Sequence, residues 1–251
     1  MKLTKRLIAL AFAAPFALTL SSCGDSADPE GGLSGDPIDP IAAPEGQAWT
    51  DVVNITEQGG YQLGNPDAPI KLVEYASHTC PACASFSVTA KGPLRDDYIS
   101  TGVVAFEHRQ LIRSALDLTI ATMVQCGPKE TMQPLSDQAW ASLNEIFANV
   151  EANSAQIEAA GEMPMNERFV AIAQGMGLID FFAARGLSAD QARTCLADVE
   201  TIEGIAEQSA QQVDADNVTG TPTFLLNGAR VEGIGWEQIE PALQRAGART
   251  E

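Results

Sequence analysis

The fold of this chain is decided by residues 70–83, which read IKLVEYASHTCPAC. The first seven of these residues form a mostly apolar run typical of a buried strand, with a single carboxylate at Glu74. Pro81 suits the first turn of a helix, because proline lacks a backbone N–H and has a fixed φ. The stretch therefore predicts a strand, a short turn and a helix that begins beside Cys80.

Two thiols lie one helical turn apart at this predicted helix start, at Cys80 and Cys83. The unpaired N–H groups and the dipole of a helix N-terminus favour a thiolate over a thiol, and the thiolate is the nucleophile of disulfide exchange. We therefore expect Cys80 to be the attacking residue. Cys83, the more buried of the two, would close the disulfide or resolve a mixed one. Pro81 and Ala82, between the thiols, are expected to face the substrate.

A second motif, GTPTF at residues 220–224, precedes another apolar run. A proline donates neither a hydrogen bond nor a proton, so it can lie against a dithiol without competing for it. We expect Pro222 to be cis and opposite Cys80, and Thr221 to offer a strand edge to an extended substrate peptide. An ordinary loop proline is the alternative for any Thr-Pro pair taken alone.

Turn-forming and helix-capping residues, together with the spacing of apolar residues, predict the other elements. Asn227-Gly228 favours a tight hairpin turn, and Ser188 with Gln191 forms a capping-box pattern. The full set comprises strands at 49–55, 70–76 and 103–108, an active-site helix over 81–98 that is irregular at Gly92-Pro93, helices from about 116 to 212, a hairpin over 223–232 and a helix from about Trp236.

The ordered set of landmarks resembles the thioredoxin superfamily, and within it the DsbA-like periplasmic thiol oxidoreductases. The resemblance covers roughly residues 60–248. It implies an α/β, thioredoxin-like fold in residues 49–251, with a helical insertion at about 116–212 between the half that carries Cys-x-x-Cys and the half that carries the cis-proline. It also implies a thiol:disulfide oxidoreductase that needs no cofactor. The landmarks are Gly64-Asn65-Pro66-Asp67-Ala68-Pro69, the Cys80–Cys83 motif, the insertion, Thr221-Pro222, and a terminal hairpin and helix.

The resemblance also assigns roles near the dithiol. Glu74 matches the buried acid that moves the proton of the second cysteine, and burial would raise its pKa; a surface glutamate is the alternative. Ala82 departs from the usual Pro-His dipeptide, so Cys80 is expected to be less acidic. His78 would partly compensate beside the substrate, with a solvated loop histidine as the alternative.

The remaining cysteines suggest a second pair. With Cys80 and Cys83 paired and Cys23 set apart, Cys126 and Cys195 are left within the helical region. We expect them to form a structural disulfide. Some of the DsbA-like proteins that this chain resembles carry a second disulfide in their helical region. Two buried, reduced cysteines are the alternative.

The N-terminus predicts export. Three cationic residues precede an apolar run at 7–20, which is too short to span a bilayer, so residues 1–22 are interpreted as a signal peptide. The sequence LSSC at 20–23 resembles a lipobox, which predicts a lipidated Cys23 on the periplasmic side, with outer-membrane attachment favoured by Gly24. Residues 24–47 show no hydrophobic period, so residues 23–48 are expected to be a flexible tether. Ordinary signal cleavage that leaves a free Cys23 is the alternative.

The charge limits the partners. The chain has a formal net charge of -18, and loss of the three cations of the signal peptide leaves about -21, which excludes nucleic acid. The resemblance implies cysteine-containing envelope proteins as substrates, with a DsbB-like membrane protein as reoxidant or a DsbD-like protein as reductant. We favour the disulfide donor, although Thr221 before Pro222 resembles the isomerase and reductase branches.

Two alternatives from other classes remain open. Cys80 and Cys83 with a histidine would form a metal site, but only one spaced ligand pair is visible, so none is assigned. The second alternative is a lipoprotein that keeps the fold for binding alone, in which replacing Cys80 would leave the function intact.

Overall fold

The structure is a computed structural model that describes residues 34–248. The signal peptide predicted at 1–22 and the lipidated Cys23 lie outside the described residues and stay predictions. Within residues 34–248, no helix has both the length and the apolar character needed to cross a membrane.

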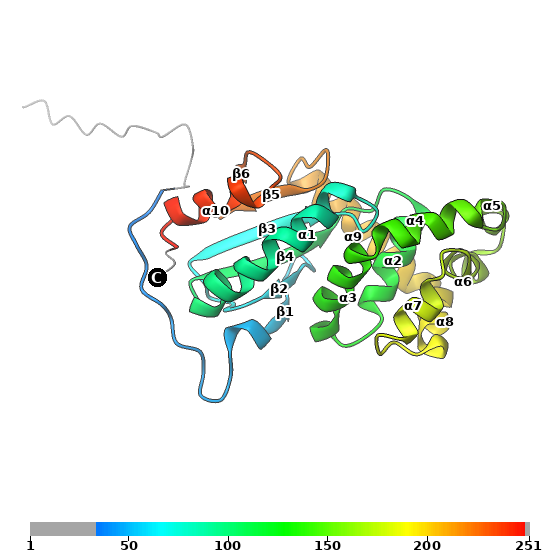
Figure 1. Cartoon of the computed structure of the whole chain (residues 1–251), viewed down its shortest axis with the longest axis horizontal. Coiled ribbons are helices and arrows are strands. Elements are labelled where there is room, and N and C mark those ends of the chain that lie inside the picture. The colour runs from blue at the N-terminus through cyan, green and yellow to red at the C-terminus, as the bar shows by residue number, and fades with distance from the viewer. Residues whose placement is uncertain (1–33, 249–251) are drawn as a thin grey trace, which may run out of the picture. The chain divides into compact units, whose positions relative to one another are not determined.

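A six-stranded mixed sheet organises the domain (Figure 1). Its strands run in the order β1-β2-β4-β3-β5-β6, with β3 and β4 parallel and the other neighbours antiparallel. The strand that leads to the dithiol, β3, therefore lies inside the sheet between β4 and β5. The strands are β1 (Val53–Ile55), β2 (Tyr61–Leu63), β3 (Ile70–Ala76), β4 (Val104–Gln110), β5 (Thr223–Leu226) and β6 (Ala229–Val231).

Helices cover this sheet and form a separate insertion between β4 and β5. The α-helices are α1 (Pro81–Pro93), α2 (Ala115–Gln125), α3 (Lys129–Ala141), α4 (Leu143–Ala152), α5 (Ser154–Gly161), α6 (Met165–Gly175), α7 (Leu178–Ala183), α8 (Ala189–Ala197), α9 (Val199–Ala215) and α10 (Trp236–Arg245). Three short helical segments complete the set, a π-helix at Leu94–Tyr98 and 3-10 turns at Trp49–Asp51 and Ile99–Thr101.

The register of the sheet decides which side chains lie beneath α1. Leu72 of β3 is level with Phe106 of β4 and with Leu226 of β5, and all three pack in one core with Phe86 of α1 and with α10. Side chains two residues apart on a strand share a face. Glu74 therefore points into this same apolar layer, under the helix that carries the dithiol.

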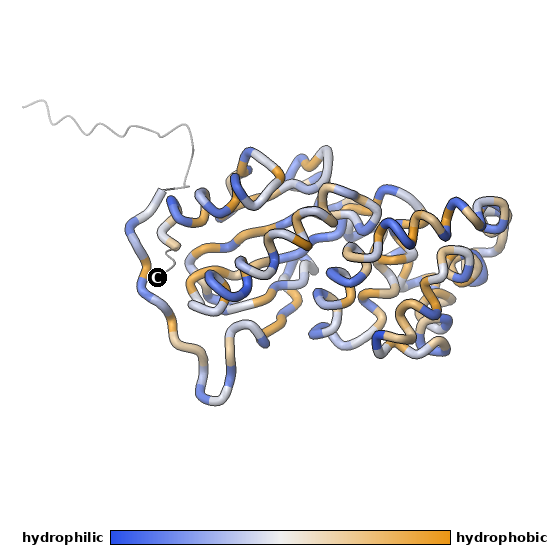
Figure 2. The backbone as a smooth tube through the Cα atoms, viewed as in Figure 1, coloured by the Kyte–Doolittle hydropathy of each residue, from blue (hydrophilic) through white to orange (hydrophobic). Residues whose placement is uncertain are grey.

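The insertion, α2 to α9, has a core of its own. Apolar and polar segments alternate along its helices (Figure 2). The capping box of Ser188 and Gln191 starts α8 as predicted. A disulfide joins Cys126, at the end of α2, to Cys195 of α8, with 5.9 Å between the Cα atoms.

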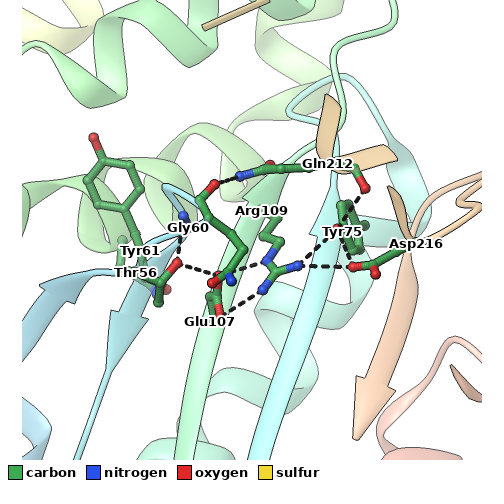
Figure 3. Close-up of polar contacts among 10 residues, drawn as sticks. Thr56, Gly60, Tyr61, Tyr75, Glu107, Arg109, Gln212 and Asp216 are labelled. Atoms are coloured by element: carbon green, nitrogen blue, oxygen red, sulfur yellow. Dashed lines mark hydrogen bonds and ion pairs between the residues drawn. The ribbon is translucent and has the colours of Figure 1, made fainter. Parts of the chain in front are cut away.

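The opposite face of the sheet carries a polar network (Figure 3). Arg109 of β4 donates to Glu107 on the same strand at 2.7 Å and to Asp216 at 3.0 Å. The hydroxyl of Tyr75 donates to the same Asp216 carboxylate at 2.6 Å, and Thr56 donates to Glu107 at 2.8 Å. Because Asp216 follows α9 directly, the network fixes the chain where it returns from the insertion towards residues 220–222.

The structure differs from the sequence-based prediction at the N-terminal side. The backbone of Gly35 bonds to Arg245, that of Ile38 to Gly247 and that of Ile41 to Thr101. Residues 35–41 therefore lie along the domain instead of continuing a flexible tether, and the domain begins before residue 49. The packing depends on α10, which lies far away in the sequence.

Two further elements differ from the prediction, and a third agrees with it. The strand predicted over 49–55 is a 3-10 turn followed by β1, because the ring of Trp49 is buried and its Nε1 donates to the carbonyl of Ile41 at 2.7 Å. The strand β2, which lies between β1 and β4, was not predicted, since it is only three residues long. The helix predicted over 81–98 has the irregularity expected at Gly92-Pro93: it changes to a π-helix after Pro93, which has no N–H to continue the α-helical ladder.

Candidate active site

Cys80 occupies the N-cap of α1. Its backbone is extended, with φ of -96° and ψ of 116°, while its carbonyl already accepts the N–H of Ala84 at 3.0 Å. The N–H of Cys83 points to the Cys80 Sγ at 3.5 Å. Pro81 begins the helix as predicted. The sulfur of Cys80 is therefore held among the unpaired donors of a helix start, where negative charge is stabilised.

The two cysteines have opposite ionisation tendencies. The pKa of Cys80 is lowered to about 5, chiefly by the hydrogen bond with the Cys83 side chain and also by Thr221 and the N–H groups of Cys83 and Ala82, against the opposing effect of burial. Burial raises the pKa of Cys83 far above the usual range of a thiol. Cys80 is 4% exposed and Cys83 is fully buried. Only Cys80 can then attack, or be attacked by, a thiol from outside.

Glu74 lies beneath this pair, fully buried, as its register position requires. Neither of its carboxylate oxygens has a hydrogen-bond partner among residues 34–248. Burial raises the pKa of Glu74 to about 7, and the ammonium of Lys91, 3.9 Å from Oε2, opposes that rise. The Glu74 charge in turn raises the pKa of Cys83. A carboxyl that titrates near neutrality beside a buried thiol can give and accept its proton.

The lysine near Glu74 belongs to a group that the sequence analysis missed. Lys91 forms an ion pair with Asp137 of α3 at 2.9 Å, and its ammonium lies 4.4 Å from the ring centroid of Trp140. Ser87 donates to the same Asp137 at 2.7 Å. Cys83, Ser87 and Lys91 follow one another at intervals of four residues, which places them on one face of α1. This spacing was the one sequence feature that could have indicated the group. Nothing in the sequence links them to α3.

The cis-proline loop meets the dithiol from the other side. The Thr221–Pro222 peptide bond is cis, as predicted, and the carbonyl oxygen of Thr221 lies 3.4 Å from the Cys80 Sγ. Pro222 itself is buried, and Thr221 is partly exposed. The backbone just before Pro222 is therefore adjacent to the reactive sulfur, at the position expected for an extended substrate.

A groove of about 620 Å³ begins beside Ala82 and lies between α1 and the start of α10. Its apolar side chains include Phe86, Trp236 and Ile234, and Ile234 is 54% exposed. Pro81 is exposed and Ala82 partly exposed, so both can contact a bound polypeptide.

His78 is not at this surface. Its ring is fully buried, its Nε2 lies 2.9 Å from the Ser136 Oγ, and it stacks on Trp140 with centroids 4.9 Å apart. Burial lowers its pKa to about 3, so it is neutral at physiological pH. The prediction that His78 contacts substrate is wrong, and so is its alternative as a solvated loop residue, because α3 of the insertion covers it. His78 therefore adds no positive charge to compensate for Ala82, which stands where the DsbA-like dipeptide usually has a histidine.

Comparison with known proteins agrees with this architecture. The model of the family described as Thioredoxin matches residues 56–245. The chain is similar to a curated protein of Rickettsia bellii named "Putative protein-disulfide oxidoreductase", with 23% identity over 184 residues, 73% of this chain and 63% of that protein. The chain spans about 60% of the length of such curated relatives.

Solved structures give the same result. A protein-disulfide isomerase from Novosphingobium aromaticivorans superposes with a TM-score of 0.69 and 31% identity, covering 74% of this chain and 96% of that one. Wolbachia pipientis alpha-DsbA1 shares the fold with a TM-score of 0.60 and 18% identity, covering 77% and 93%. The chain therefore belongs to the thioredoxin family, and its helical insertion gives it the DsbA-like form of that fold.

Proposed function

We propose that this protein is a thiol:disulfide oxidoreductase that donates the Cys80–Cys83 disulfide to cysteine-containing proteins of the cell envelope. The observation that carries the proposal is the position of Cys80 at the N-cap of α1, with the Cys83 N–H directed at its sulfur and the Cys83 thiol buried; this position lowers the pKa of Cys80 to about 5. A stabilised thiolate favours the reduced form of a dithiol, and a protein whose reduced form is favoured is an oxidant.

The reaction transfers two electrons from substrate to protein. A substrate thiolate attacks the Cys80 Sγ of the disulfide, and the Cys83 sulfur leaves and takes a proton from Glu74. A second substrate thiolate then attacks the substrate sulfur of the mixed disulfide and expels Cys80 as a thiolate. The substrate gains a disulfide and the protein becomes the dithiol. The Thr221 backbone and the groove beside Ala82 support an extended substrate next to the reactive sulfur.

A donor of this kind requires reoxidation, for which we propose a DsbB-like membrane protein. A reductase or isomerase at the same site would instead receive electrons from a DsbD-like protein. The similar Novosphingobium protein is named an isomerase, and Thr221 before the cis-proline favours the same branch. The same dithiol can serve either direction, so its redox potential is the property that distinguishes these alternatives.

The test is the equilibrium reduction potential of Cys80–Cys83 in glutathione buffers, with a Cys80→Ser variant as control. A potential above that of the glutathione couple is expected for a donor. A value near that of thioredoxin, about -270 mV, would contradict the donor assignment and favour the reductant. Full activity of Cys80→Ser would instead favour the lipoprotein that acts by binding alone.

The metal-binding alternative has less support. Among residues 34–248, no group of three or more histidine, cysteine or acidic side chains is arranged to hold a metal ion. Zinc analysis of the reduced protein distinguishes the two functions, since stoichiometric tight zinc would contradict the redox assignment.

We also propose that the protein is exported and anchored by a lipid at Cys23, on the lipobox-like residues 20–23. The expected result is a membrane-associated protein whose N-terminal peptide has the mass of a lipidated cysteine. A Cys23→Ser variant should be released into the soluble fraction. An unmodified wild-type N-terminus would contradict the anchor. Separation of the inner and outer membranes tests whether the anchor is in the outer membrane.

A further inference from the structure

The turn that connects β3 to Cys80 is held by the insertion. The carbonyl of Ser77 accepts two N–H groups, that of Cys80 at 3.1 Å and the indole Nε1 of Trp140 at 3.0 Å. The next residue, His78, bonds to the insertion through its side chain and also through its backbone N–H. The position of Cys80 therefore depends on side chains of the insertion, on α2 and α3.

The backbone bond of His78 ends on a buried carboxylate in the first turn of α2. Asp117 is fully buried, and its Oδ1 accepts the His78 N–H at 2.8 Å. Its Oδ2 accepts the N–H of Arg113 at 3.0 Å, in the segment that leaves β4. Burial raises the pKa of Asp117 to about 6, so at neutral pH it is ionised and both oxygens are acceptors. One side chain thus joins the turns that follow the two central parallel strands.

We propose that Asp117 is a positioning residue for thiol–disulfide exchange, which sets the place of Cys80 by holding the backbone of His78. The inference rests on the proposed function, because it concerns the sulfur that exchanges. It goes beyond that function in making the insertion part of the redox site.

The two redox states should depend on this bond to different extents. In the disulfide form, the covalent link to Cys83 holds Cys80 in place. In the dithiol form, the Cys80 thiolate is stabilised only if it stays near the Cys83 N–H and Thr221. Loss of the Asp117 bond should therefore weaken the thiolate form more than the disulfide form.

The first variant is Asp117→Asn, in which an amide N–H₂ group replaces one acceptor and faces a backbone donor. A hydrogen bond to an ionised group corresponds to roughly a tenfold to hundredfold factor in an equilibrium constant. We expect the equilibrium with glutathione to shift on the order of tenfold towards the disulfide, which is about 30 mV for a two-electron couple. The midpoint of thiolate absorbance of Cys80 should rise by about one pH unit.

The matched control is Ser114→Ala on the same helical turn. The Ser114 hydroxyl accepts the N–H of Asp117 at 3.2 Å and caps α2, but makes no bond to the turn at residues 77–80. This variant should lose stability equally in both redox states and keep the potential and the thiolate midpoint of the wild type. An unchanged potential in Asp117→Asn, with both redox states equally destabilised, would show a purely structural role and overturn the proposal.

A second variant guards against failure of Asp117→Asn to fold. Ser136→Ala removes the partner of the His78 ring on α3 with little change in volume. A shift in the same direction as that expected for Asp117→Asn supports positioning by the insertion, and no shift contradicts it. The reduction potential of the wild type tests the proposed donor function. The difference in potential between variant and wild type tests the positioning role of Asp117. Failure of one can therefore be distinguished from failure of the other.

Discussion

Replacing Glu74 by glutamine should stabilise the protein at neutral and alkaline pH. The carboxyl is fully buried, and burial raises its pKa from an ordinary value of 4.5 to about 7. Each pKa unit corresponds to about 1.4 kcal/mol, so keeping Glu74 ionised in the folded state costs about 3 kcal/mol. Glutamine has a similar shape and cannot ionise, so the variant avoids this cost.

The sign follows from proton binding. Between pH 4.5 and about 7 the folded protein keeps a proton on Glu74 that the unfolded chain has released. The free energy of unfolding should therefore fall as the pH rises through this window, and the contribution of Glu74 should level off above it. The difference between Glu74→Gln and wild type should be flat below the window and larger by about 3 kcal/mol above it. A constant offset from the amide group does not alter this pH dependence.

The assay is urea unfolding of the oxidised proteins, in which Cys80 and Cys83 do not titrate, in buffers of equal ionic strength that span the window. Glu145→Gln, at an exposed position of α4, controls for the loss of one negative charge. The same buffers allow reduction by dithiothreitol to be timed, and Glu74→Gln should slow it because Cys83 loses its proton source. A stability difference that is independent of pH would refute the titration of Glu74 near neutrality.

Three further predictions concern the groups around this site. Lys91→Met should raise the pKa of Glu74 further, because the ammonium 3.9 Å away opposes the rise; the midpoint of the pH-dependent stability should move upward, and a downward shift would contradict the pairing. The thiolate absorbance of the reduced protein should titrate near pH 5 and vanish in Cys80→Ser, whereas a midpoint near the ordinary value of 9.0 would exclude a stabilised thiolate. Replacing Cys126 and Cys195 together by serine removes a link across 69 residues, which should cost about 4 kcal/mol of unfolding free energy by loop closure. Denaturant titration measures that loss, and equal stability with and without the disulfide would contradict it.

Much of the fold was predictable because its signals are local. Pro81 starts α1, and Asn227 and Gly228 form the predicted hairpin turn with φ of 49° and 84°. The helical character of the region between the two motifs was also readable, because amphipathic spacing depends only on neighbours within a helix. The same holds for the reactive cysteine, since a helix N-cap acts on its own side chain.

The surroundings of the dithiol were not predictable from the same signals. His78 is an ordinary turn residue in the sequence, and only packing of α3 over it makes it buried and neutral. Asp137 and Asp117 are two of many acidic residues, and nothing near them in the chain indicates that they meet Lys91 or the turn before Cys80.

The pair of thiols at the start of α1, the proline that faces them and the order of the main strands and helices around them all follow from the amino-acid sequence. Each of these depends on the conformational preferences of a few adjacent residues. The ionisation of Glu74, the burial of His78 and the contacts that hold the active-site turn follow only from the folded arrangement. Those properties come from desolvation and charge pairing between segments far apart in the chain, which become defined only when the insertion packs against the sheet.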